Sequence, residues 1–209
     1  MKLRNKRVLI TGGSSGIGFA LAKAMLDSGA HVVITGRRPD ALIAATNQLA
    51  AKNGHVWGVA ADVGSAEGRA RTLTGALDAL HGLDILVNNA GGVRAGRLEA
   101  TTEVEIEAMI RVDLLAPILL TRAALPALRQ SGEAMVVNIA SGIALVGTPF
   151  YATYGAAKAG LAHFGEALRR ELKSEGIHVL TAYPGGTDTP MMRSNRAGPE
   201  LGSTREPAS

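Results

Sequence analysis

Tyr154 and Lys158 are two residues whose types and spacing could carry acid/base chemistry. They lie four positions apart in a segment predicted to be helical, so their side chains share one face of the helix. A phenol has a pKa of about 10 and is a poor proton donor or acceptor at neutral pH, but an adjacent ammonium group favours the phenolate and lowers that pKa. We therefore expect the pair to act as an acid/base. The hydroxyl of Ser141, which follows a predicted strand, is expected on the same ligand-binding side of the sheet.

A glycine-rich turn near the N-terminus could bind a phosphate group. It reads TGGSSGIG over residues 11–18 and joins the first predicted strand to the first predicted helix. A turn at such a junction exposes backbone N–H groups and directs the positive end of the helix dipole at a pyrophosphate. The alternative is a tight turn with no ligand. The candidate cofactor-binding residues here are Thr11, Gly12, Ser14, Ser15, Gly16, Ile17 and Gly18.

Gly36, Arg37 and Arg38 follow the second predicted strand, where a dinucleotide-binding fold places the residues that contact the adenosine ribose. An acid here would bind the ribose hydroxyls of NAD, whereas an arginine accommodates the additional phosphate of NADP. The arginines therefore predict NADP (NADPH) as the cofactor, and the missing acid opposes an S-adenosylmethionine methyltransferase. The alternative is that both arginines are simply solvated at a helix start.

Six apolar runs rich in β-forming residues predict the sheet that would bring these residues together. Continuous apolar runs separated by helical stretches are typical of a parallel sheet covered on both faces, so a doubly wound Rossmann-type α/β fold is expected. Thr102 and Glu105 predict a capping box at the start of a long helix over residues 102–128, and Gly29 and Gly176 predict helix ends. The predicted strands are residues 7–11, 31–36, 55–60, 84–89, 134–140 and 178–183.

The composition excludes several classes of protein. The 209 residues are 46% hydrophobic and 19% charged, which is typical of a globular chain. Because no cysteine is present, disulfides, thiolate metal sites and a cysteine nucleophile are excluded, and no metal site is expected. A net charge of +4 without basic blocks and an aromatic content of 3% argue against nucleic acid as a partner. No export signal or bilayer-spanning run is visible, so a soluble, cytoplasmic protein is expected.

In the order of its motifs, the chain resembles the short-chain dehydrogenase/reductases over residues 6 to about 192. The resemblance rests on the glycine-rich turn, an Asp-Val pair, an NNAG segment, Ser141, the Tyr154 and Lys158 pair, and a Pro-Gly to Thr stretch. It implies that the Asp-Val pair lies at the adenine, that NNAG supports the cofactor and that the last stretch holds the nicotinamide end. The residues so implied are Asp62, Val63, Asn88, Asn89, Ala90, Gly91, Pro184, Gly185, Thr187 and Thr189.

The resemblance implies an NADP-dependent oxidoreductase that transfers a hydride between the nicotinamide and a carbonyl or secondary alcohol. Tyr154 would handle the proton on the substrate oxygen, Ser141 would hydrogen-bond that oxygen, and Lys158 would lower the Tyr154 pKa and hold the nicotinamide ribose. Residues 1–192 would form this one domain, and helices at 102–128 and 154–175 would pair in a homodimer. A small, apolar substrate is expected, although its candidate pocket residues could also be plain core. These are Gly92, Val93, Ile143, Leu145, Phe150, Tyr151, Met191 and Met192.

Two departures from the family pattern bear on the function. The long helix usually contributes an asparagine to a proton relay, and this chain has Asp113 there, which when ionised accepts hydrogen bonds but donates none. A protonated or water-bridged Asp113 could substitute, or the carboxyl group could simply be satisfied by backbone or water. The chain is also expected to be C-terminally short, with residues 193–209 a shortened lid or a flexible tail. The alternative function is a truncated, catalytically weak relative that serves as an NADP-binding sensor or regulatory protein.

Overall fold

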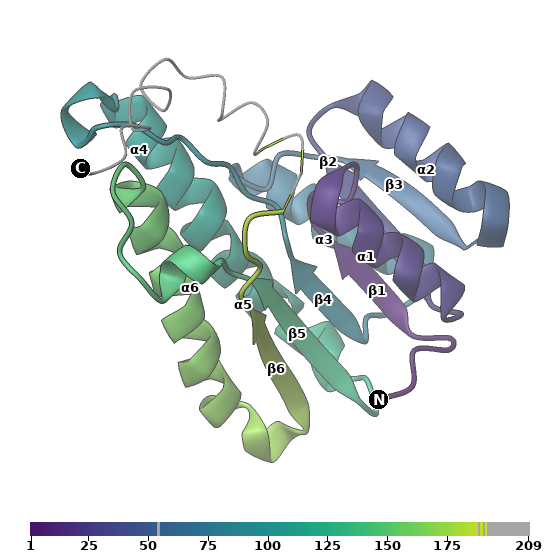
Figure 1. Cartoon of the computed structure of the whole chain (residues 1–209). Coiled ribbons are helices and arrows are strands. Elements are labelled where there is room, and N and C mark those ends of the chain that lie inside the picture. The colour runs from purple at the N-terminus through teal and green to yellow at the C-terminus, as the bar shows by residue number, and fades with distance from the viewer. Residues whose placement is uncertain (54, 188, 190, 192–209) are drawn as a thin grey trace.

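Six parallel strands form the sheet of the structure, a computed structural model that describes residues 1–53, 55–187, 189 and 191 (Figure 1). Their order across the sheet is β3-β2-β1-β4-β5-β6, and every neighbouring pair is parallel. This is the order of dinucleotide-binding sheets, in which ligands bind at the carboxyl ends of the strands near the point of reversal, here between β1 and β4. The strands are β1 (Arg7–Ile10), β2 (His31–Gly36), β3 (Val56–Ala60), β4 (Ile85–Asn88), β5 (Ala134–Ile139) and β6 (Ile177–Ala182).

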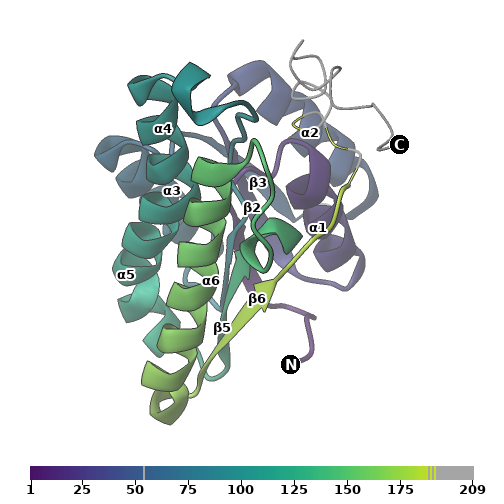
Figure 2. The same ribbon diagram turned by 60° about the vertical axis from the view of Figure 1, so that its left-hand side comes forward.

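Helices cover both faces of the sheet, which confirms the predicted doubly wound α/β fold (Figure 2). α1 and α2 pack on one face, where Leu26 and Leu42 join an apolar cluster with the strands. α3, α5 and α6 pack on the other face, where Leu80, Leu120 and Leu168 join a second cluster. The helices are α1 (Gly16–Asp27), α2 (Pro39–Asn53), α3 (Ala66–Leu80), η1 (Leu98–Ala100), α4 (Glu103–Ile110), the π-helical η2 (Arg111–Leu115), α5 (Ala116–Arg129), η3 (Gly142–Ala144), α6 (Ala152–Glu171) and η4 (Lys173–Glu175).

The central strand β1 shows why the strand sequences are continuously apolar. Val8 and Ile10 belong to the cluster under α1 and α2, and Leu9 belongs to the cluster on the other face. Successive side chains of a strand point to opposite faces, so a strand covered on both sides needs an apolar residue at every position. All three side chains are fully buried.

The predicted helix caps are present. The Thr102 hydroxyl accepts from the Glu105 N–H, and the Thr102 N–H donates to the Glu105 carboxylate at 2.9 Å, which together form a capping box. Gly29 and Gly176 have φ values of +83° and +71°, in the left-handed region that glycine reaches without the steric cost of a Cβ. Each therefore ends a helical segment just before a strand.

The long helix predicted over residues 102–128 is interrupted in the structure. It is built from α4 and α5 with the π-helical segment η2 between them. Pro117 has no N–H to donate, and its ring conflicts with the carbonyl of the residue four positions earlier, which is Asp113. The wider turn of η2 therefore falls where the proline disturbs the α-helical ladder, and such turns often occur at functional sites.

Two predicted features lie outside the described part of the chain. The predicted lid or tail, residues 193–209, and the candidate pocket residue Met192 both lie there. Among the helices that are described, none combines the length and the apolar character needed to cross a membrane.

Candidate active site

A cavity of about 730 Å³ opens at the carboxyl ends of the strands. Its volume is in the range of ligand-binding pockets. The loops that follow β1, β2, β3, β4, β5 and β6 all contribute to its wall, and η2 and α6 close one side. The predicted site residues on this wall are Gly12, Ser14, Ser15, Gly16, Ile17, Arg37, Arg38, Asp62, Val63, Asn89, Ala90, Gly91, Asp113, Ser141, Tyr154, Lys158, Pro184, Gly185, Thr187 and Thr189.

The glycines of the first turn are required by its geometry. Gly12 has a φ of +66°, and a Cβ built there would lie 2.9 Å from the Cα of Ala90. A Cβ on Gly18 would overlap the Gly12 carbonyl oxygen and the Asn89 side chain, so this glycine permits close packing behind the cavity. Gly16 has a φ of +56° and lies on the cavity wall. The turn therefore brings bare backbone to the cavity surface.

The N-terminus of α1 points its amide groups toward this turn. The N-cap residue Ser15 makes no side-chain capping hydrogen bond to the helix. The first N–H groups of a helix have no partners within the helix and carry the positive end of its dipole, so they favour an anion. The junction thus fits a phosphate group, because it combines close backbone approach with N–H groups that Ser15 does not cap.

Thr11 and Asn89 hold the turn against the end of β4. The Thr11 hydroxyl accepts from the N–H groups of Asn89 and Ala90, both at 3.0 Å. The Asn89 side-chain amide donates in return to the carbonyl oxygens of Thr11 and Gly12 at 2.9 and 3.1 Å. Asn88 is buried and donates to Thr121 and Asn138 at 2.9 Å each. Thr11 and Asn88 therefore brace the turn and the sheet from behind the wall.

Arg37, Arg38 and Asp62 lie at the end of the cavity that is formed by the loops after β2 and β3. Both arginines are exposed, and both line the cavity as the chain leaves β2. The carboxylate of Asp62 accepts the Gly64 N–H at 2.9 Å, which fixes the turn between β3 and α3. This end of the cavity therefore presents two cations and one anchored carboxylate.

Ser141, Tyr154 and Lys158 also line this cavity. Ser141 follows β5 as the N-cap of η3, and its hydroxyl accepts the Ile143 N–H at 3.3 Å. Tyr154 lies in the first turn of α6, and Lys158 lies one turn later, where it is buried. The predicted shared face of the helix is therefore present.

The pKa of Tyr154 is shifted in the direction opposite to the predicted one. Burial and the negative charge of Asp113 raise it to about 12, and a hydrogen bond with Ser141 opposes that rise. The Lys158 Nζ lies 5.8 Å from the centre of the Tyr154 ring. The expected lowering by Lys158 was therefore wrong, because burial disfavours the phenolate and the Asp113 carboxylate lies beside the ammonium.

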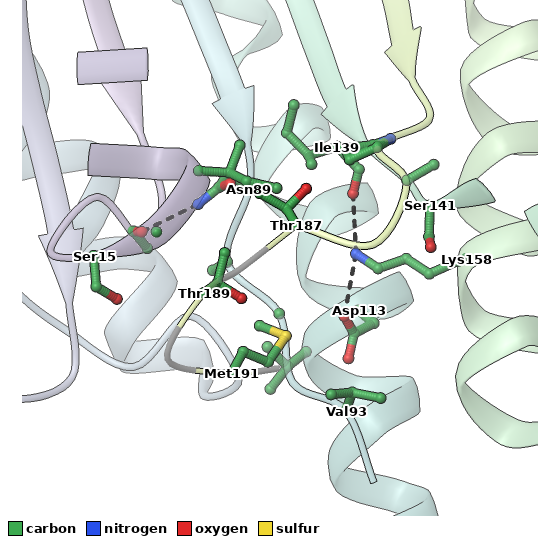
Figure 3. A pocket seen from close by; sticks show the side chains of 18 of the residues that line it. Ser15, Asn89, Val93, Asp113, Ile139, Ser141, Lys158, Thr187, Thr189 and Met191 are labelled. Carbon is green, nitrogen blue, oxygen red and sulfur yellow. Dashed lines mark hydrogen bonds and ion pairs between the residues drawn. The ribbon is translucent and has the colours of Figure 1, made fainter. Parts of the chain in front are cut away.

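Asp113 and Lys158 form a buried ion pair between η2 and α6 (Figure 3). Lys158 Nζ lies 3.2 Å from Asp113 Oδ1 and donates to the Ile139 carbonyl oxygen at 3.0 Å. The carboxylate also accepts the Gly92 N–H, at 3.1 Å to Oδ2 and 3.3 Å to Oδ1. Burial raises the pKa of Asp113 above its ordinary value, and the opposing effects of Lys158 and the Gly92 N–H offset that rise only in part. The structure matches the expectation that backbone groups satisfy the Asp113 carboxyl group. The Lys158 side chain is a further partner that was not expected.

Part of the cavity wall is apolar or aromatic. Val93, Ile143, Tyr151 and Met191 are the candidate pocket residues that line the cavity. The rings of Tyr151 and Tyr154 meet edge to face with their centres 6.5 Å apart. Leu145 is 67% exposed and is not core.

The loop before α6 is held by an unusual backbone geometry at Phe150. Phe150 has a φ of +69°, which is rare for a bulky residue and strains the backbone. Its carbonyl oxygen accepts the Gly96 N–H at 2.9 Å, which joins this loop to the one after β4. Gly92 donates its N–H to the Asp113 carboxylate. Phe150 and Gly92 therefore support the cavity wall from behind and do not line the cavity itself.

Several wall residues carry no signal in the sequence. The Ile139 carbonyl oxygen accepts a hydrogen bond from Lys158. Every residue has a backbone carbonyl, so the sequence gives no sign of this contact. Ala140 and Val112 belong to the wall because of where the chain turns. The wall residues that sequence reasoning missed are Thr35, Ala61, Val112, Ile139, Ala140, Gly142 and Gly186.

Comparisons with known proteins agree with this geometry. The model of the short chain dehydrogenase family matches residues 6–200. The 3-oxoacyl-[acyl-carrier-protein] reductase FabG of Chlamydia trachomatis is 34% identical over 193 residues, which cover 92% of this chain and 78% of the relative. The ketoacyl reductase HetN of Nostoc is 33% identical over 183 residues, and the match spans 88% of this chain but only 64% of that relative.

Two solved structures share the fold. A short chain dehydrogenase from Burkholderia cenocepacia in complex with NADP matches with a TM-score of 0.86 and 35% identity, over 97% of this chain and 82% of that one. A 3-ketoacyl-(acyl-carrier-protein) reductase from Brucella melitensis complexed with NADH matches with a TM-score of 0.87 and 30% identity, over 91% and 80%. On its sequence, its sheet order and the residues around its cavity, the chain belongs to the short-chain dehydrogenase/reductase family of oxidoreductases.

Proposed function

We propose that this protein is an NADP-dependent oxidoreductase that reduces a carbonyl group, with Tyr154 as the proton donor. The observation that carries the proposal is that Ser141, Tyr154 and Lys158 line the same cavity as the glycine-rich turn. The nicotinamide cofactor would supply the hydride. The chain's own residues would bind the cofactor, orient the carbonyl and deliver the proton.

The cavity wall fits a dinucleotide along its length. The bare backbone at Gly12 and Gly16 and the N-terminus of α1 would bind the pyrophosphate. Asp62 and Val63 would lie at the adenine, and the stretch from Pro184 to Thr189, as far as it is described, would lie at the nicotinamide end. Asn89, Ala90 and Gly91 would support the middle of the cofactor.

Arg37 and Arg38 support NADP over NAD. They stand at the end of β2, and the residue before them is a glycine, so no carboxylate there repels a phosphate on the adenosine ribose. A guanidinium group is suited to phosphate because it presents several N–H donors in one plane. The two solved relatives hold NADP and NADH respectively, so these arginines are the basis for the choice.

Tyr154 and Ser141 would act on the oxygen of the substrate carbonyl. Tyr154, whose pKa burial raises to about 12, holds its proton at neutral pH as an ordinary phenol also does. It can therefore donate to an oxygen that gains charge as the hydride arrives. The Ser141 hydroxyl would hydrogen-bond the same oxygen. Stabilisation of developing charge by fixed donors in a cavity is often the largest contribution to catalysis.

The apolar part of the cavity wall supports an apolar substrate. Val93, Ile143 and Met191 are apolar, and Tyr151 presents an aromatic ring. Such a wall favours an uncharged, apolar chain next to the carbonyl. The names of the ketoacyl and oxoacyl reductase relatives are consistent with a carbonyl substrate.

A homodimer completes the proposal. The pairing would involve the helical layer of α4, α5 and α6, which lies on one side of the sheet (Figure 2). A symmetric contact of one surface with itself is the commonest route to an oligomer. Light scattering at micromolar concentration is expected to give twice the monomer mass, and a monomer would contradict it.

The decisive experiment follows consumption of NADPH by its absorbance against a panel of ketones, aldehydes and oxoacyl thioesters. We expect turnover with at least one apolar carbonyl compound. Binding of NADPH with no turnover across the panel would contradict the proposal and favour the sensor alternative. The same panel with NADH tests the choice of cofactor.

A further inference from the structure

The turn between β3 and α3, residues 62–65, forms part of the cavity wall. Asp62 and Val63 line the cavity, and Asp62 is exposed whereas Val63 is buried. The turn is closed by two hydrogen bonds of its own. The Gly64 N–H donates to the Asp62 carboxylate at 2.9 Å, and the Ser65 N–H donates to the Asp62 carbonyl oxygen at 3.1 Å. Where Val63 lies on the wall therefore depends on what holds the 62–65 turn against the rest of the molecule.

The guanidinium group of Arg69 holds the 62–65 turn from the side of α3. Its Nη1 donates to the carbonyl oxygens of Val63 and Gly64, at 3.0 and 3.1 Å. Hydrogen bonds in which the donor is charged are roughly twice as strong as those between neutral groups. Arg69 is half-buried and is not among the described residues that line the cavity, so it acts on the turn and not on a ligand.

The stability of α3 does not account for a cation at this position. Arg69 is the fourth residue of the helix, close to the positive end of its dipole, which favours acidic side chains such as that of Glu67. The Ser65 hydroxyl already caps this end by accepting the Gly68 N–H at 2.9 Å. The carbonyl oxygens of the 62–65 turn, and not the helix itself, therefore explain the place of the guanidinium group.

The other side of the 62–65 turn rests on η2. A Cβ built on Gly64 would lie 3.3 Å from Val112 Cγ2, so the backbone of the turn packs closely against this side chain. Val112 lines the cavity, as Val63 does. The turn is thus held between two helical segments, and Arg69 provides hydrogen bonds from the α3 side.

We propose that Arg69 is a positioning residue for the dinucleotide, which binds the Val63 and Gly64 carbonyl oxygens and so fixes the 62–65 turn as the wall that receives the adenine. The proposal rests on the proposed function, because it needs a dinucleotide in the cavity. A wall that is already ordered loses less conformational freedom when a ligand binds, so a looser turn should weaken binding. The effect should be equal for NADPH and NADH, since both carry the adenine.

The first test measures the 62–65 turn without any cofactor. Arg69→Met keeps an unbranched side chain and removes the N–H donors. Hydrogen exchange followed by mass spectrometry should show faster exchange of the Gly64 and Ser65 amides in this variant. Arg71→Met, which changes an exposed arginine two residues further along α3, is the matched control and should exchange as the wild type does. Wild-type exchange in Arg69→Met would overturn the proposal, whether or not the protein turns over a substrate.

The second test compares the affinities for NADPH and NADH. We expect Arg69→Met to weaken the binding of both by about tenfold, the size of effect expected when hydrogen bonds of a charged group are lost. The KM for NADPH should rise while kcat at saturating NADPH stays unchanged, because the reacting end of the cavity is not altered. Arg71→Met should leave both affinities unchanged. A loss confined to NADPH would show that Arg69 acts through its charge on the additional phosphate, and would overturn the proposal.

Arg69→Lys tests the same contact with a smaller change, since the ammonium group still donates but the side chain is shorter. The exchange rate and both affinities should fall between those of the wild type and Arg69→Met. If Arg69→Met does not fold, Arg69→Lys against the wild type makes the comparison by itself. Faster exchange with wild-type affinity for both dinucleotides would overturn the proposal, because the position of the turn would then not affect binding. Dinucleotide binding that depends on Arg69 as expected, without turnover of any carbonyl compound, would overturn the proposed function and leave this proposal standing.

Discussion

The guanidinium group of Arg7 and the carboxylate of Asp84 form a two-bond ion pair at the amino-terminal edge of the sheet. Arg7 donates through Nη2 to Oδ1 at 2.7 Å and through Nε to Oδ2 at 3.0 Å. The Ser131 hydroxyl donates to Oδ1 at 2.6 Å, and the Arg7 N–H donates to Oδ2 at 2.8 Å. The pair thus ties β1 to the start of β4 and to the loop before β5, at the end of the strands opposite the cavity.

This pair makes stability depend on pH below 4. Burial alone would raise the pKa of Asp84, but the hydrogen bonds from Arg7 and Ser131 lower it to about 2. A lowered pKa means that the stabilisation is complete above the unfolded value of about 3.9 and is lost as pH falls toward 2. Urea titrations between pH 5 and 2 should show the loss, and Asp84→Asn should reduce this pH dependence.

The same substitution should also lower stability at neutral pH. Asp84→Asn removes hydrogen bonds to a charged group, and we expect a loss of about 2 kcal/mol in the free energy of unfolding at pH 7. Activity in the folded protein should persist, since the pair is remote from the cavity. A wild-type free energy of unfolding for the variant would show that the pair contributes no net stability.

Gly12→Ala should damage both folding and cofactor binding. A residue with a Cβ at this φ of +66° costs about 1–2 kcal/mol, and the Cβ would also press on the Cα of Ala90. Gly132→Ala is the control, because a Cβ there meets no atom within 4 Å. Thermal unfolding and NADPH titration should show losses for Gly12→Ala only, and equal behaviour of the two variants would contradict the role of the turn.

The elements could be predicted from the sequence because their causes are local. Continuous apolar runs mark strands buried on both faces, and Thr102 with Glu105 forms the predicted capping box. The interruption at η2 was not predicted, because a proline is tolerated in the first turn of a helix. Only the structure shows that Pro117 follows directly on the helical segments α4 and η2. The long helix was therefore expected to be regular.

The electrostatics of the site could not be predicted from spacing along one helix. Tyr154 and Lys158 suggested a lowered tyrosine pKa, since only their separation of four residues was visible. Asp113 lies 45 positions before Lys158, and their contact depends on the packing of η2 against α6. Burial of the phenol, together with the charge that this distant segment contributes, raises the pKa of Tyr154 instead of lowering it.

Tyr154→Phe should reduce turnover and spare cofactor binding. The variant loses the O–H that would give a proton to the substrate oxygen, and loss of a general acid costs about 10²–10⁴-fold in rate. The affinity for NADPH should change little, because the ring remains. Steady-state kinetics and fluorescence titration measure the two quantities, with Tyr183→Phe as the control. Wild-type turnover in Tyr154→Phe would show that another group donates the proton.

Arg37→Ala tests the choice of cofactor. Arg37 is exposed at the end of β2 and lines the cavity, so its guanidinium group can reach a phosphate on the adenosine ribose. A hydrogen bond to a charged group contributes roughly 1.5–3 kcal/mol, and about 1.4 kcal/mol is tenfold in affinity, so NADPH binding should weaken by about tenfold to a hundredfold. NADH has no such phosphate, and its affinity should barely change.

The control for this prediction is Arg71→Ala, which removes an exposed arginine on α3 away from the cavity. It should leave both affinities at their wild-type values, and so would exclude a general effect of net charge on binding. Calorimetric titration of both cofactors into wild type and the two variants gives the comparison. Equal losses for NADPH and NADH in Arg37→Ala, or a wild-type preference for NADH, would mean that Arg37 does not contact the phosphate.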